Sequence, residues 1–302
     1  MTVAITGATG FVGLTLLDEA ARRGIDVQAL TRSKQKPRDG VRWISGDLAD
    51  EAALFDLVDG CEAVIHVAGV VNAPDAAGFE EGNVRGTVRL IDAARKAGVQ
   101  RFVFVSSLSA RAPELSNYGA SKARAERQVR ASGLDWTIVR PPGIFGPRDR
   151  EVLEMFKAAK WGVVPMPPPG RASWIHVDDL ARLLLALVPG GEDVSHRIFE
   201  PDDGRRNGWS HREWGRAIGW AVGRRPWVPH LSQGLLEKAA KADRMLRGGK
   251  AKLTPDRVGY MVHPDWTVDP GKAVPQARWT PQVDPRKGLK DTARWYREHK
   301  WL

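Results

Sequence analysis

The order of apolar and polar residues predicts alternating strands and helices through the first half of the chain. The short apolar runs, which are typical of buried strands, lie at residues 3–5, 26–30, 63–67, 102–105 and 136–139. The longer runs with helical periodicity lie at residues 11–23, 52–58, 79–97 and 120–131. Alternation of this kind requires crossover connections between parallel strands. The sequence therefore predicts an α/β fold with a doubly wound parallel sheet that helices cover on both faces.

The second half of the chain is less regular, which predicts a smaller domain of mixed structure. A proline-rich stretch occupies residues 165–170, and residues 174–188 contain a helix. Further helical patterns lie near residues 211–222, 235–246 and 288–299. We expect a sheet domain over residues 1–199, with a substrate-side loop at about residues 143–172, and a small substrate-capping domain over residues 200–302. Such a domain would cover the carboxyl ends of the parallel strands, where open α/β sheets bind ligands.

The composition favours a soluble cytoplasmic protein with an anionic partner. The 302 residues include one cysteine, Cys61, which excludes an internal disulfide and a multi-cysteine metal site. No apolar run reaches the roughly 20 residues that span a bilayer, and the first residues enter a strand without a basic leader. The net charge of +10 suits an anionic cofactor or an acidic surface. Lysine and arginine are scattered, without the aromatic RNA-binding motifs or zinc spacings of base-reading proteins, so we expect no nucleic-acid partner.

A glycine-rich segment, Thr6–Gly13, joins the first predicted strand to the first predicted helix. In this position Gly7 suits a tight turn, Gly10 lets the backbone approach a pyrophosphate, and Gly13 lets the helix pack closely on the strand. The amino terminus of the helix then favours the phosphate charge. The alternative is an ordinary strand-to-helix turn, which the strand before and the helix after make less favourable. We therefore predict a dinucleotide-binding turn.

A tyrosine and a lysine, Tyr118 and Lys122, lie four residues apart and project from the same face of a predicted helix. An unperturbed phenol has a pKa of about 10, and a neighbouring ammonium favours the phenolate. The pair can therefore exchange a proton with a carbinol or carbonyl oxygen near neutral pH. The alternative is a half-buried surface pair, which is less favoured in a chain that also carries a dinucleotide motif. The sequence thus predicts a hydride-transfer site that needs a hydride carrier.

The end of the second predicted strand indicates which cofactor the chain prefers. An acidic side chain at this point would bind the ribose hydroxyls of NAD. Residues 29–34 contain no acid, and Arg32 with Ser33 can bind a 2′-phosphate. We therefore expect NADP(H) to be preferred over NAD(H). The alternative is that Arg32 is a solvated loop cation.

Eight short segments carry a resemblance to a known family. They lie, in chain order, at residues 6–13, 46–48, 66–69, 83–87, 105–107, 118–122, 140–147 and 176–179. Together they resemble the extended short-chain dehydrogenase/reductase family, which includes NAD-dependent epimerases and dehydratases, and the likeness covers nearly the whole chain. The resemblance implies a Rossmann-type sheet, a C-terminal substrate-binding domain and an NAD(P)-dependent oxidoreductase.

The resemblance also implies a role for each residue of the reaction centre. Tyr118 would be the general acid/base, and Lys122 would support it and bind the nicotinamide ribose. Ser107 ends a buried strand and would hydrogen-bond the reacting oxygen. Ser106 and Ser109 lie close enough in sequence to be alternatives for this role.

Other residues would hold the cofactor or support the site. Asn83 would lie in a helix beneath the site and position the lysine or a relay water, and Asp47 would accept a hydrogen bond from the adenine amine. No metal site is expected, because Asp178 and Asp179 are interpreted as acids that open a helix. The implied cofactor contacts are Gly7, Thr9, Gly10, Phe11, Val12, Arg32, Asp47, Leu48, Val67, Ala68, Gly69, Tyr118, Lys122, Pro141, Gly143 and Ile144.

Sequence segments near the end of the chain indicate the class of substrate to expect. The relevant segments lie at residues 253–258, 266–273, 279–281, 288–289 and 295–296. They resemble the 3β-hydroxysteroid dehydrogenase and dihydroflavonol-reductase-like branch of the family. This branch implies a ketoreductase or hydroxy dehydrogenase that acts on a hydrophobic, lipid-like substrate of sterol or sphingolipid type.

Two other functions stay open. A sugar-nucleotide epimerase or dehydratase would use the same reaction centre, with a basic diphosphate pocket built from residues such as Arg148, Arg150 or Arg171. Arg32 weighs mildly against this function, because epimerases usually retain NAD. A non-catalytic NADPH-binding assembly protein, like the Rossmann-type accessory subunit of respiratory complex I, would not need the intact tyrosine and lysine.

Residues 231–252 combine apolar side chains with many cations. The apolar ones that can share a helical face are Leu231, Leu235, Leu236, Ala239, Ala240, Ala242, Met245 and Leu246, and the cations are Lys238, Lys241, Arg244, Arg247, Lys250 and Lys252. Such a helix suits peripheral contact with the inner face of a membrane, and the alternative is a domain helix that packs inward. Tryptophan-rich segments around residues 161, 209, 214, 220 and 227 suit either a pocket lining or a core. A homodimer also stays open.

Overall fold

The structure is a computed structural model that describes residues 1–248 and 251–302. Its internal contacts divide the chain into two compact units. Unit 1 contains residues 1–140, 180–200 and 271–280, and unit 2 contains residues 141–179, 201–270 and 281–302. This division differs from a single boundary at residue 200. The reason is that residues 141–179 pack with C-terminal elements: helix α6 packs on α8, and strand β8 pairs with β11 and β12.

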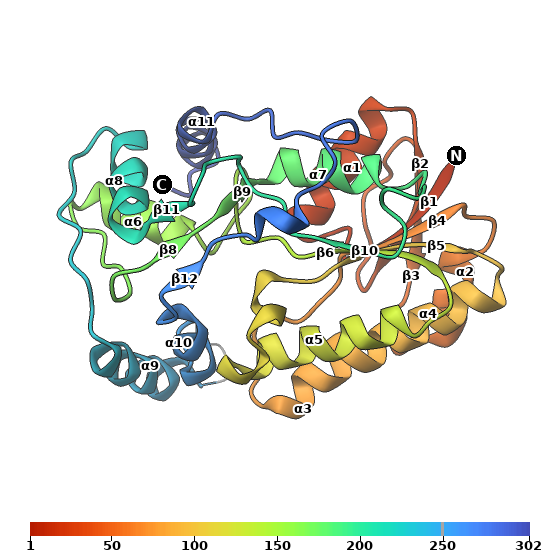
Figure 1. Ribbon diagram of the computed structural model, residues 1–302, viewed down its shortest axis with the longest axis horizontal. Helices are drawn as coiled ribbons and strands as arrows, with labels where there is room; N and C mark the ends of the chain where they lie inside the picture. Colours follow the sequence, from red (N-terminus) through yellow and green to blue (C-terminus); the bar gives the residue numbers. More distant parts are fainter. Residues whose placement is uncertain (249–250) are drawn as a thin grey trace. The chain divides into compact units, whose positions relative to one another are not determined.

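Unit 1 is built on a parallel sheet of seven strands (Figure 1). The strand order is β3-β2-β1-β4-β5-β6-β10, and every paired strand runs parallel to its neighbour. The chain order reverses between β1 and β4, which is the topological switch point where open sheets bind ligands. The predicted doubly wound sheet is therefore confirmed. Its strands are β1 Thr2–Thr6, β2 Asp26–Thr31, β3 Val41–Ser45, β4 Ala63–His66, β5 Arg101–Val105, β6 Asp135–Val139 and β10 Arg197–Phe199.

Helices cover both faces of this sheet, with α1 on one face and α4 and α5 on the other (Figure 1). On the second face, buried side chains of the strands, including Phe102, Phe104 and Ile138, pack with Leu57 of α2 and Leu90 of α4 in one apolar core. Burial of this apolar area is the main stabilising contribution to the unit. The helices are α1 Phe11–Arg22, α2 Glu51–Val58, α3 Ala76–Phe79, α4 Gly86–Lys96, α5 Asn117–Arg130 and α7 Val177–Ala186, with the short turns η1 Glu80–Arg85, η2 Leu108–Arg111 and η3 Pro113–Leu115.

Three parts of unit 1 depart from the predicted pattern. Strand β3 was missed because it lies at the sheet edge and buries only Ile44 fully, so its sequence lacks an apolar run. Strand β10, at the other edge, has three residues, too few for a periodic signal. The predicted helix over residues 79–97 divides into the π-helical turn η1 and helix α4. Such π-helical turns are frequent at functional sites.

Unit 2 has two small sheets and five helices among its described residues. Strand β8 pairs antiparallel with β11 and parallel with β12, so this sheet has mixed strand directions, and the unit combines strands and helices as predicted. Trp214 packs in the core against Trp174, Trp209 and Phe145. The elements are β7 Gly143–Phe145, α6 Leu153–Lys160, β8 Arg171–Ala172, β9 Trp174–His176, β11 Trp209–Ser210, α8 His211–Ala221, α9 Gln233–Arg247, α10 Pro255–Met261, β12 Asp265–Trp266 and α11 Pro285–Glu298. The turn η5 Pro270–Lys272, between β12 and α11 in sequence, is where the chain passes from unit 2 to unit 1.

The closest glycine contact in unit 1 predicts that adding a single methyl group at Gly13 would destabilise the fold. A Cβ atom on Gly13 would lie 2.1 Å from the Gly7 carbonyl oxygen, whereas Gly234, also in a helix, has no neighbour within 4 Å of the same position. We expect Gly13→Ala to lower the free energy of unfolding by about 1–3 kcal/mol, because backbone must shift to admit the methyl group. Gly234→Ala should raise it slightly, by up to about 1 kcal/mol. Urea unfolding of the two variants compares them directly, and equal midpoints would contradict this packing.

Candidate active site

The glycine turn after β1 has the geometry of a phosphate-binding turn. Gly7 has a positive φ of 73°, and a Cβ there would lie 2.7 Å from the backbone nitrogen of Ala68. Gly10 is the N-cap of α1, where no side chain accepts a hydrogen bond, and the first turn of α1 contains no acid. The first backbone N–H groups of the helix therefore face a place that suits an anion. Thr9 is exposed, and Phe11 and Val12 are partly exposed beside it.

A buried histidine holds the turn that follows β4. His66 Nδ1 lies 2.6 Å from Thr6 Oγ1, and its Nε2 lies 3.0 Å from Thr87 Oγ1. The same Thr6 hydroxyl accepts a hydrogen bond from the backbone N–H of Ala68 at 3.2 Å. Burial, and secondarily the charge of Lys122, lower the pKa of His66 to about 3, so the imidazole is neutral. Its effect is to fix residues 67–69, a role that sequence reasoning had not assigned.

Asn83 connects three parts of unit 1. Its Oδ1 accepts from the Val70 backbone N–H at 2.7 Å, and its Nδ2 donates to the Val70 carbonyl and to Ser121 Oγ, both at 2.9 Å. These bonds tie the turn after β4 to helix α5. A Cβ on Gly69 would lie 3.2 Å from Asn83 Oδ1 and 3.6 Å from Lys122 Nζ. Glycine at position 69 therefore leaves no side chain between this backbone and the Asn83 and Lys122 side chains.

The predicted tyrosine and lysine lie at the amino end of α5. Ser116 caps this helix by accepting a hydrogen bond from the Gly119 N–H at 3.0 Å. Gly119 packs closely on the loop after β5, because a Cβ there would lie 2.6 Å from the Ser109 carbonyl oxygen. Tyr118 is partly exposed, and its ring lies 6.1 Å from that of Phe79. The helix start is thus fixed against the loop that carries the candidate serines.

Lys122 is buried, with 3% of its surface exposed. Its Nζ donates to the Val105 carbonyl at 2.8 Å and lies 4.4 Å from the centre of the Phe104 ring. Burial lowers the pKa of Lys122 to about 8, while the charge of Glu126 acts in the opposite direction. A buried amine of this kind is typical of a functional site, because the fold bears the cost of its desolvation.

The structure distinguishes the candidate serines. Ser106 is buried, and its hydroxyl donates to Glu126 at 2.5 Å. Ser107 is partly exposed and caps η2, since its Oγ accepts a hydrogen bond from the Ser109 N–H at 3.2 Å. The Ser107 hydroxyl proton is therefore available to a ligand, whereas that of Ser106 is used within the protein. Ser109 stays an alternative, since it is also partly exposed.

An ion-pair network behind the serines was not predicted. Glu126 makes two hydrogen bonds with Arg140, at 2.8 and 2.6 Å, and Arg140 also approaches the fully buried Glu200 at 3.4 Å. Arg111 and Lys272 contact Glu200 at 3.5 and 3.2 Å. Buried charges that are paired in this way fix the positions of the strands and helices that carry them. Sequence patterns contain little signal for this network, because its members are far apart along the chain.

The residues expected around the adenosine are exposed or partly exposed. Arg32 lies on the surface after β2, and we find no ion pair for it in the described part of the chain. The Asp47 carboxylate accepts the Ala49 N–H at 2.7 Å, and Leu48 packs over Gly86, whose Cβ would lie 2.8 Å from it. These side chains follow β2 and β3, at the carboxyl ends of neighbouring parallel strands. Their contacts with a cofactor stay a prediction.

Other predicted residues belong to unit 2. Gly143 and Ile144 lie in β7, and a Cβ on Gly143 would meet the Trp174 ring at 2.5 Å. Asp179 accepts the backbone N–H groups of Gln282 and Val283, both at 3.1 Å, which is a structural role. Pro141 also belongs to this unit. A cofactor contact of Pro141, Gly143 and Ile144 stays a prediction.

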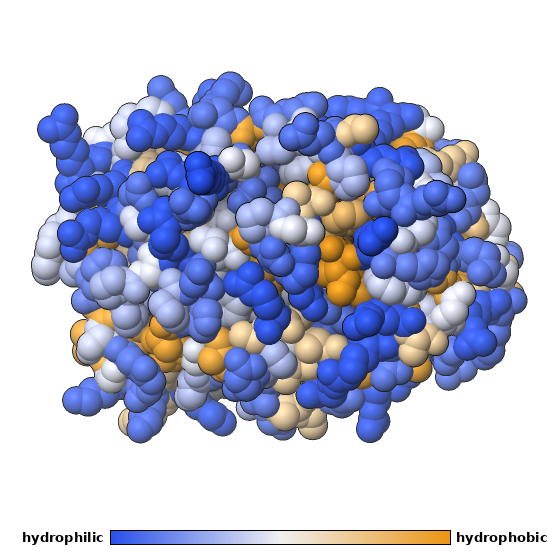
Figure 2. All heavy atoms as spheres, in the orientation of Figure 1, coloured by the Kyte–Doolittle hydropathy of each residue, from blue (hydrophilic) through white to orange (hydrophobic). Residues whose placement is uncertain are grey.

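The basic amphipathic segment forms helix α9 and packs on α10. Leu236 and Ala240 are buried against Val258 of α10, whereas Met245 and Leu246 are exposed, so the apolar residues do not form one face. Lys250 lies outside the described residues. Figure 2 shows hydrophobic side chains among hydrophilic ones over these helices. No helix in the described ranges has the length and apolar character needed to cross a bilayer.

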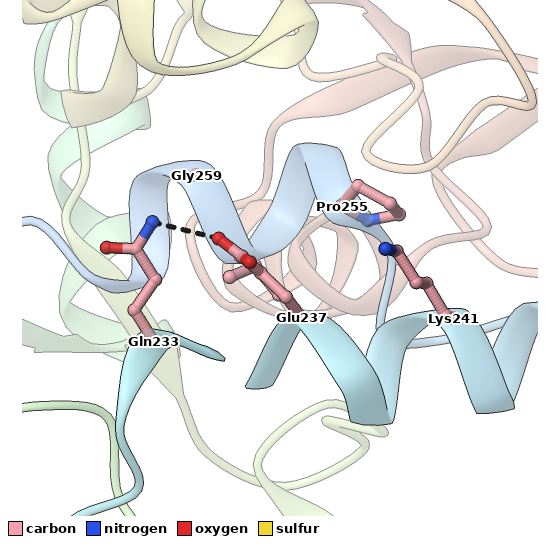
Figure 3. A pocket seen from close by; sticks show the side chains of 6 residues that line it. Gln233, Glu237, Lys241, Pro255 and Gly259 are labelled. Atoms are coloured by element: carbon pink, nitrogen blue, oxygen red, sulfur yellow. Dashed lines mark hydrogen bonds between the residues drawn. The ribbon is translucent and has the colours of Figure 1, made fainter. Parts of the chain in front are cut away.

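A pocket of about 210 Å³ lies between α9 and α10, and Figure 3 shows the side chains that line it. Gln233 and Glu237 hydrogen-bond to each other at 2.9 Å across one end, and Lys241 points toward Pro255 at the other. The pocket therefore contains a satisfied polar pair and none of the predicted catalytic residues.

Comparisons with known proteins identify the family and the fold of the chain. Residues 7–188 match a family model described as NAD(P)H-binding. The chain is 37% identical to a protein named ceramide reductase from Caulobacter vibrioides, in an alignment that covers 99% of this chain and 96% of that protein. It is 31% identical over 232 residues to a 2-alkyl-3-oxoalkanoate reductase from Stenotrophomonas maltophilia, covering 66% and 70%. The fold is similar to that of a dTDP-glucose 4,6-dehydratase from Streptomyces venezuelae solved with NAD, with a TM-score of 0.76, 24% identity and 99% and 98% coverage.

The fold and the family match define a nicotinamide-dependent oxidoreductase. The chain belongs to the extended short-chain dehydrogenase/reductase family, in which NAD-dependent epimerases and dehydratases also occur. The predicted resemblance is therefore confirmed.

The buried amine predicts how stability depends on pH. Because the pKa of Lys122 is about 8 in the folded protein and about 10.5 in the unfolded chain, the unfolded state binds more protons between these pH values. The free energy of unfolding of the wild type, relative to Lys122→Met, should therefore rise by on the order of 2–3 kcal/mol from pH 8 to pH 10.5. It should fall again as the pH returns through 8.

The measurement is urea unfolding at several pH values for the wild type, Lys122→Met and the exposed control Lys96→Met. The free energy of unfolding of Lys96→Met should depend on pH in the same way as that of the wild type. A wild-type curve that runs parallel to that of Lys122→Met would contradict the buried position of the amine.

Proposed function

We propose that the protein is an NADPH-dependent ketoreductase, or hydroxy dehydrogenase in the reverse direction, that acts on a hydrophobic, lipid-like substrate. The observation that carries the proposal is the arrangement around Lys122. Its buried amine lies beside the open position at Gly69 and one helical turn from Tyr118, next to the loop of Ser107. This arrangement supports a proton donor and a hydrogen-bond donor acting on one substrate oxygen.

Each side chain then has a defined task in the proposed reaction. A bound nicotinamide would supply the hydride that reaches the carbonyl carbon. Tyr118 gives its phenolic proton to the carbonyl oxygen, which becomes the carbinol hydroxyl. Ser107 donates a hydrogen bond to the same oxygen and stabilises the charge that develops on it. Lys122, in its ammonium form, stabilises the phenolate that remains on Tyr118.

The neighbours of Lys122 act on its position. The Val105 carbonyl and the Phe104 ring hold the ammonium at the end of β5. Asn83 fixes the backbone at Val70 and the start of α5 through Ser121, so it keeps Gly69 beside the amine. In the proposed reaction these neighbouring residues orient the reacting side chains, so that the chain need not rearrange before the proton is transferred.

The preference for NADP(H) rests on Arg32. This exposed guanidinium follows β2 on a loop that Thr31 and Gln35 brace through hydrogen bonds to Ser33. A planar cation at this point suits the 2′-phosphate of NADPH, and residues 29–34 contain no acid that would bind the ribose hydroxyls of NAD.

The proposed substrate class rests on the relatives. The relative with nearly full coverage is named a ceramide reductase, and a second is named a 2-alkyl-3-oxoalkanoate reductase. Both names describe reductases of substrates with long or branched alkyl parts. Of the sterol and sphingolipid types, they favour a sphingolipid-type ketone, which would place the protein in lipid metabolism.

A sugar-nucleotide epimerase or dehydratase is the second candidate, because the dTDP-glucose dehydratase has a similar fold. Two cations expected to bind its diphosphate have other partners within unit 2. The Arg150 guanidinium lies 4.7 Å from the centre of the Trp301 ring, and Arg171 Nε donates to the Asn207 carbonyl at 2.6 Å. These contacts favour the ketoreductase. A non-catalytic assembly role is disfavoured because the tyrosine and lysine are intact.

The cellular setting forms part of the same proposal. A cytoplasmic protein that touches the inner face of the membrane would meet a lipid-like substrate there, and a homodimer, which stays open, would leave this function unchanged. Contact through residues 231–252 stays a prediction, supported by the exposed cations of α9 and weakened by its packing on α10.

Removal of one hydroxyl tests the chemistry. We expect Tyr118→Phe to lower kcat for reduction of a keto-sphingolipid by roughly 100- to 10,000-fold, because the proton donor is lost. Binding of NADPH, followed by its fluorescence, should persist. The matched variant Tyr260→Phe removes a hydroxyl that accepts a hydrogen bond from Arg257 in unit 2, and it should retain most of the activity. Full activity of Tyr118→Phe would exclude the proposed role.

A second variant tests the cofactor preference. Arg32→Ala should weaken NADPH binding by roughly tenfold or more, because a charge-assisted hydrogen bond to phosphate is lost. NADH binding should change little. Lys36→Ala removes an exposed cation from the same loop and should have a smaller effect on NADPH. Equal losses for NADH and NADPH in Arg32→Ala would show that Arg32 does not read the 2′-phosphate.

A further inference from the structure

Unit 2 carries three exposed tryptophans in its described residues, at the carboxyl ends of two packed helices. Trp161 directly follows α6 and is 88% exposed, and Trp220, near the end of α8, is 47% exposed. Trp227 follows the turn after α8 and is 69% exposed, and Val163 is exposed next to it. Helices α6 and α8 pack on each other (Figure 1). Their carboxyl ends lie together, because Val163, after α6, pairs with Trp227, after α8, and Gly219 of α8 packs on Pro226. We call these four side chains the tryptophan surface.

The backbone beneath the tryptophan surface is well ordered by hydrogen bonds. The Trp227 N–H donates to the Gly162 carbonyl, and the Val164 N–H donates to the Trp227 carbonyl, both at 2.9 Å. The turn after α8 folds back on the helix, because a Cβ on Gly219 would lie 2.1 Å from Pro226 Cδ. The exposed indoles are therefore attached to backbone that is fixed by hydrogen bonds and close packing.

The surroundings of the tryptophan surface are basic. Residues 155–177 and 214–236 contain no aspartate or glutamate. Lys160, Arg224 and Arg225 are exposed in these stretches. Beside Trp220, a pocket of about 280 Å³ is lined by Arg205, Trp209, Glu213, Arg216, Ala217, Trp220 and Arg286.

Only part of the positive charge around this pocket is neutralised by an acidic side chain. Arg205 pairs with Glu213 at 2.8 Å and stacks on Trp209. Arg286 and Lys290 of α11 lie 5.9 and 5.8 Å from the centre of the Trp220 ring. The cations therefore surround the indole and leave a net positive charge around it.

We propose that the tryptophan surface docks the protein on the surface of a bilayer that contains anionic phospholipid. Indole rings favour the boundary between headgroups and acyl chains, because one edge is polar and the rest is apolar. The cations would be attracted to the phosphates and to the negative surface potential. The inference rests on the proposed function in one respect: a lipid-like substrate resides in such a bilayer, so a docked enzyme meets it at high local concentration.

Charge and chemistry together favour a membrane over a protein partner. Exposed aromatic residues that sit among cations, without acids in the same stretches, match the complement of an anionic lipid surface. The surface also differs from the one predicted on α9, because three of its four apolar side chains are tryptophans and all four are exposed, whereas Leu236 of α9 is buried against α10. The two surfaces can therefore be tested against each other.

The experiment is cosedimentation of the full chain with phosphatidylcholine vesicles, with and without phosphatidylglycerol, in the absence of cofactor and substrate. The variants are Trp161→Ala/Trp227→Ala, the α9 variant Met245→Ala/Leu246→Ala, and Phe55→Ala, which removes an exposed aromatic side chain from α2 of unit 1. All these side chains are exposed, so we expect the variants to fold like the wild type. Melting curves and circular dichroism spectra that match those of the wild type would confirm that they are folded.

We expect the wild type to bind the anionic vesicles, with weaker binding at high salt. The double tryptophan variant should bind at least about tenfold more weakly, while the α9 and Phe55 variants bind like the wild type. Loss of binding in the α9 variant alone, no binding by the wild type, or a changed oligomeric state of the tryptophan variant without vesicles would each overturn the proposal. The vesicle experiment measures no turnover, so a lack of membrane binding would not contradict the proposed reaction. Likewise, a lack of reductase activity would not contradict the proposed membrane docking.

Discussion

The buried amine of Lys122 is the constraint on which the rest of the site depends. Its desolvation is unfavourable, and the fold compensates for it with the Val105 carbonyl, the Phe104 ring and the charge of Glu126. Glu126 is in turn held by Arg140, which contacts Glu200. The position of one charge therefore fixes β5, β6, β10 and α5 relative to one another inside unit 1. The same network leaves Ser106 engaged and Ser107 available.

Much of unit 1 could be predicted because its signals are local. The strand–turn–helix of residues 3–23 and the spacing of Tyr118 and Lys122 need only neighbouring residues, and both have the expected backbone in the structure. The edge strands β3 and β10 were missed because they bury too little to leave an apolar run. Roles that depend on distant partners were also missed, as for His66, which lies between Thr6 and Thr87.

Unit 2 was harder to interpret, because tryptophan serves opposite purposes in it. Trp209 and Trp214 are buried in the core, whereas Trp161 and Trp227 are exposed, and nothing in the local sequence separates the two pairs. The difference arises from tertiary packing: α8 turns Trp214 toward Trp174 and Phe145, and the turns after α6 and α8 direct the others outward. Likewise, residues 141–179 follow the sheet in sequence but pack with the C-terminal elements.

The measurement that tests the central claim most directly is hydride transfer from NADPH carrying deuterium at the transferable position. The full chain would be incubated with a keto-sphingolipid and, separately, with a panel of sugar nucleotides, and products would be analysed by mass spectrometry. The account predicts deuterium on the carbinol carbon of the lipid, with one NADP⁺ formed for each alcohol. Conversion of a sugar nucleotide without net oxidation of NADPH, and an unlabelled, unreacted lipid, would contradict it.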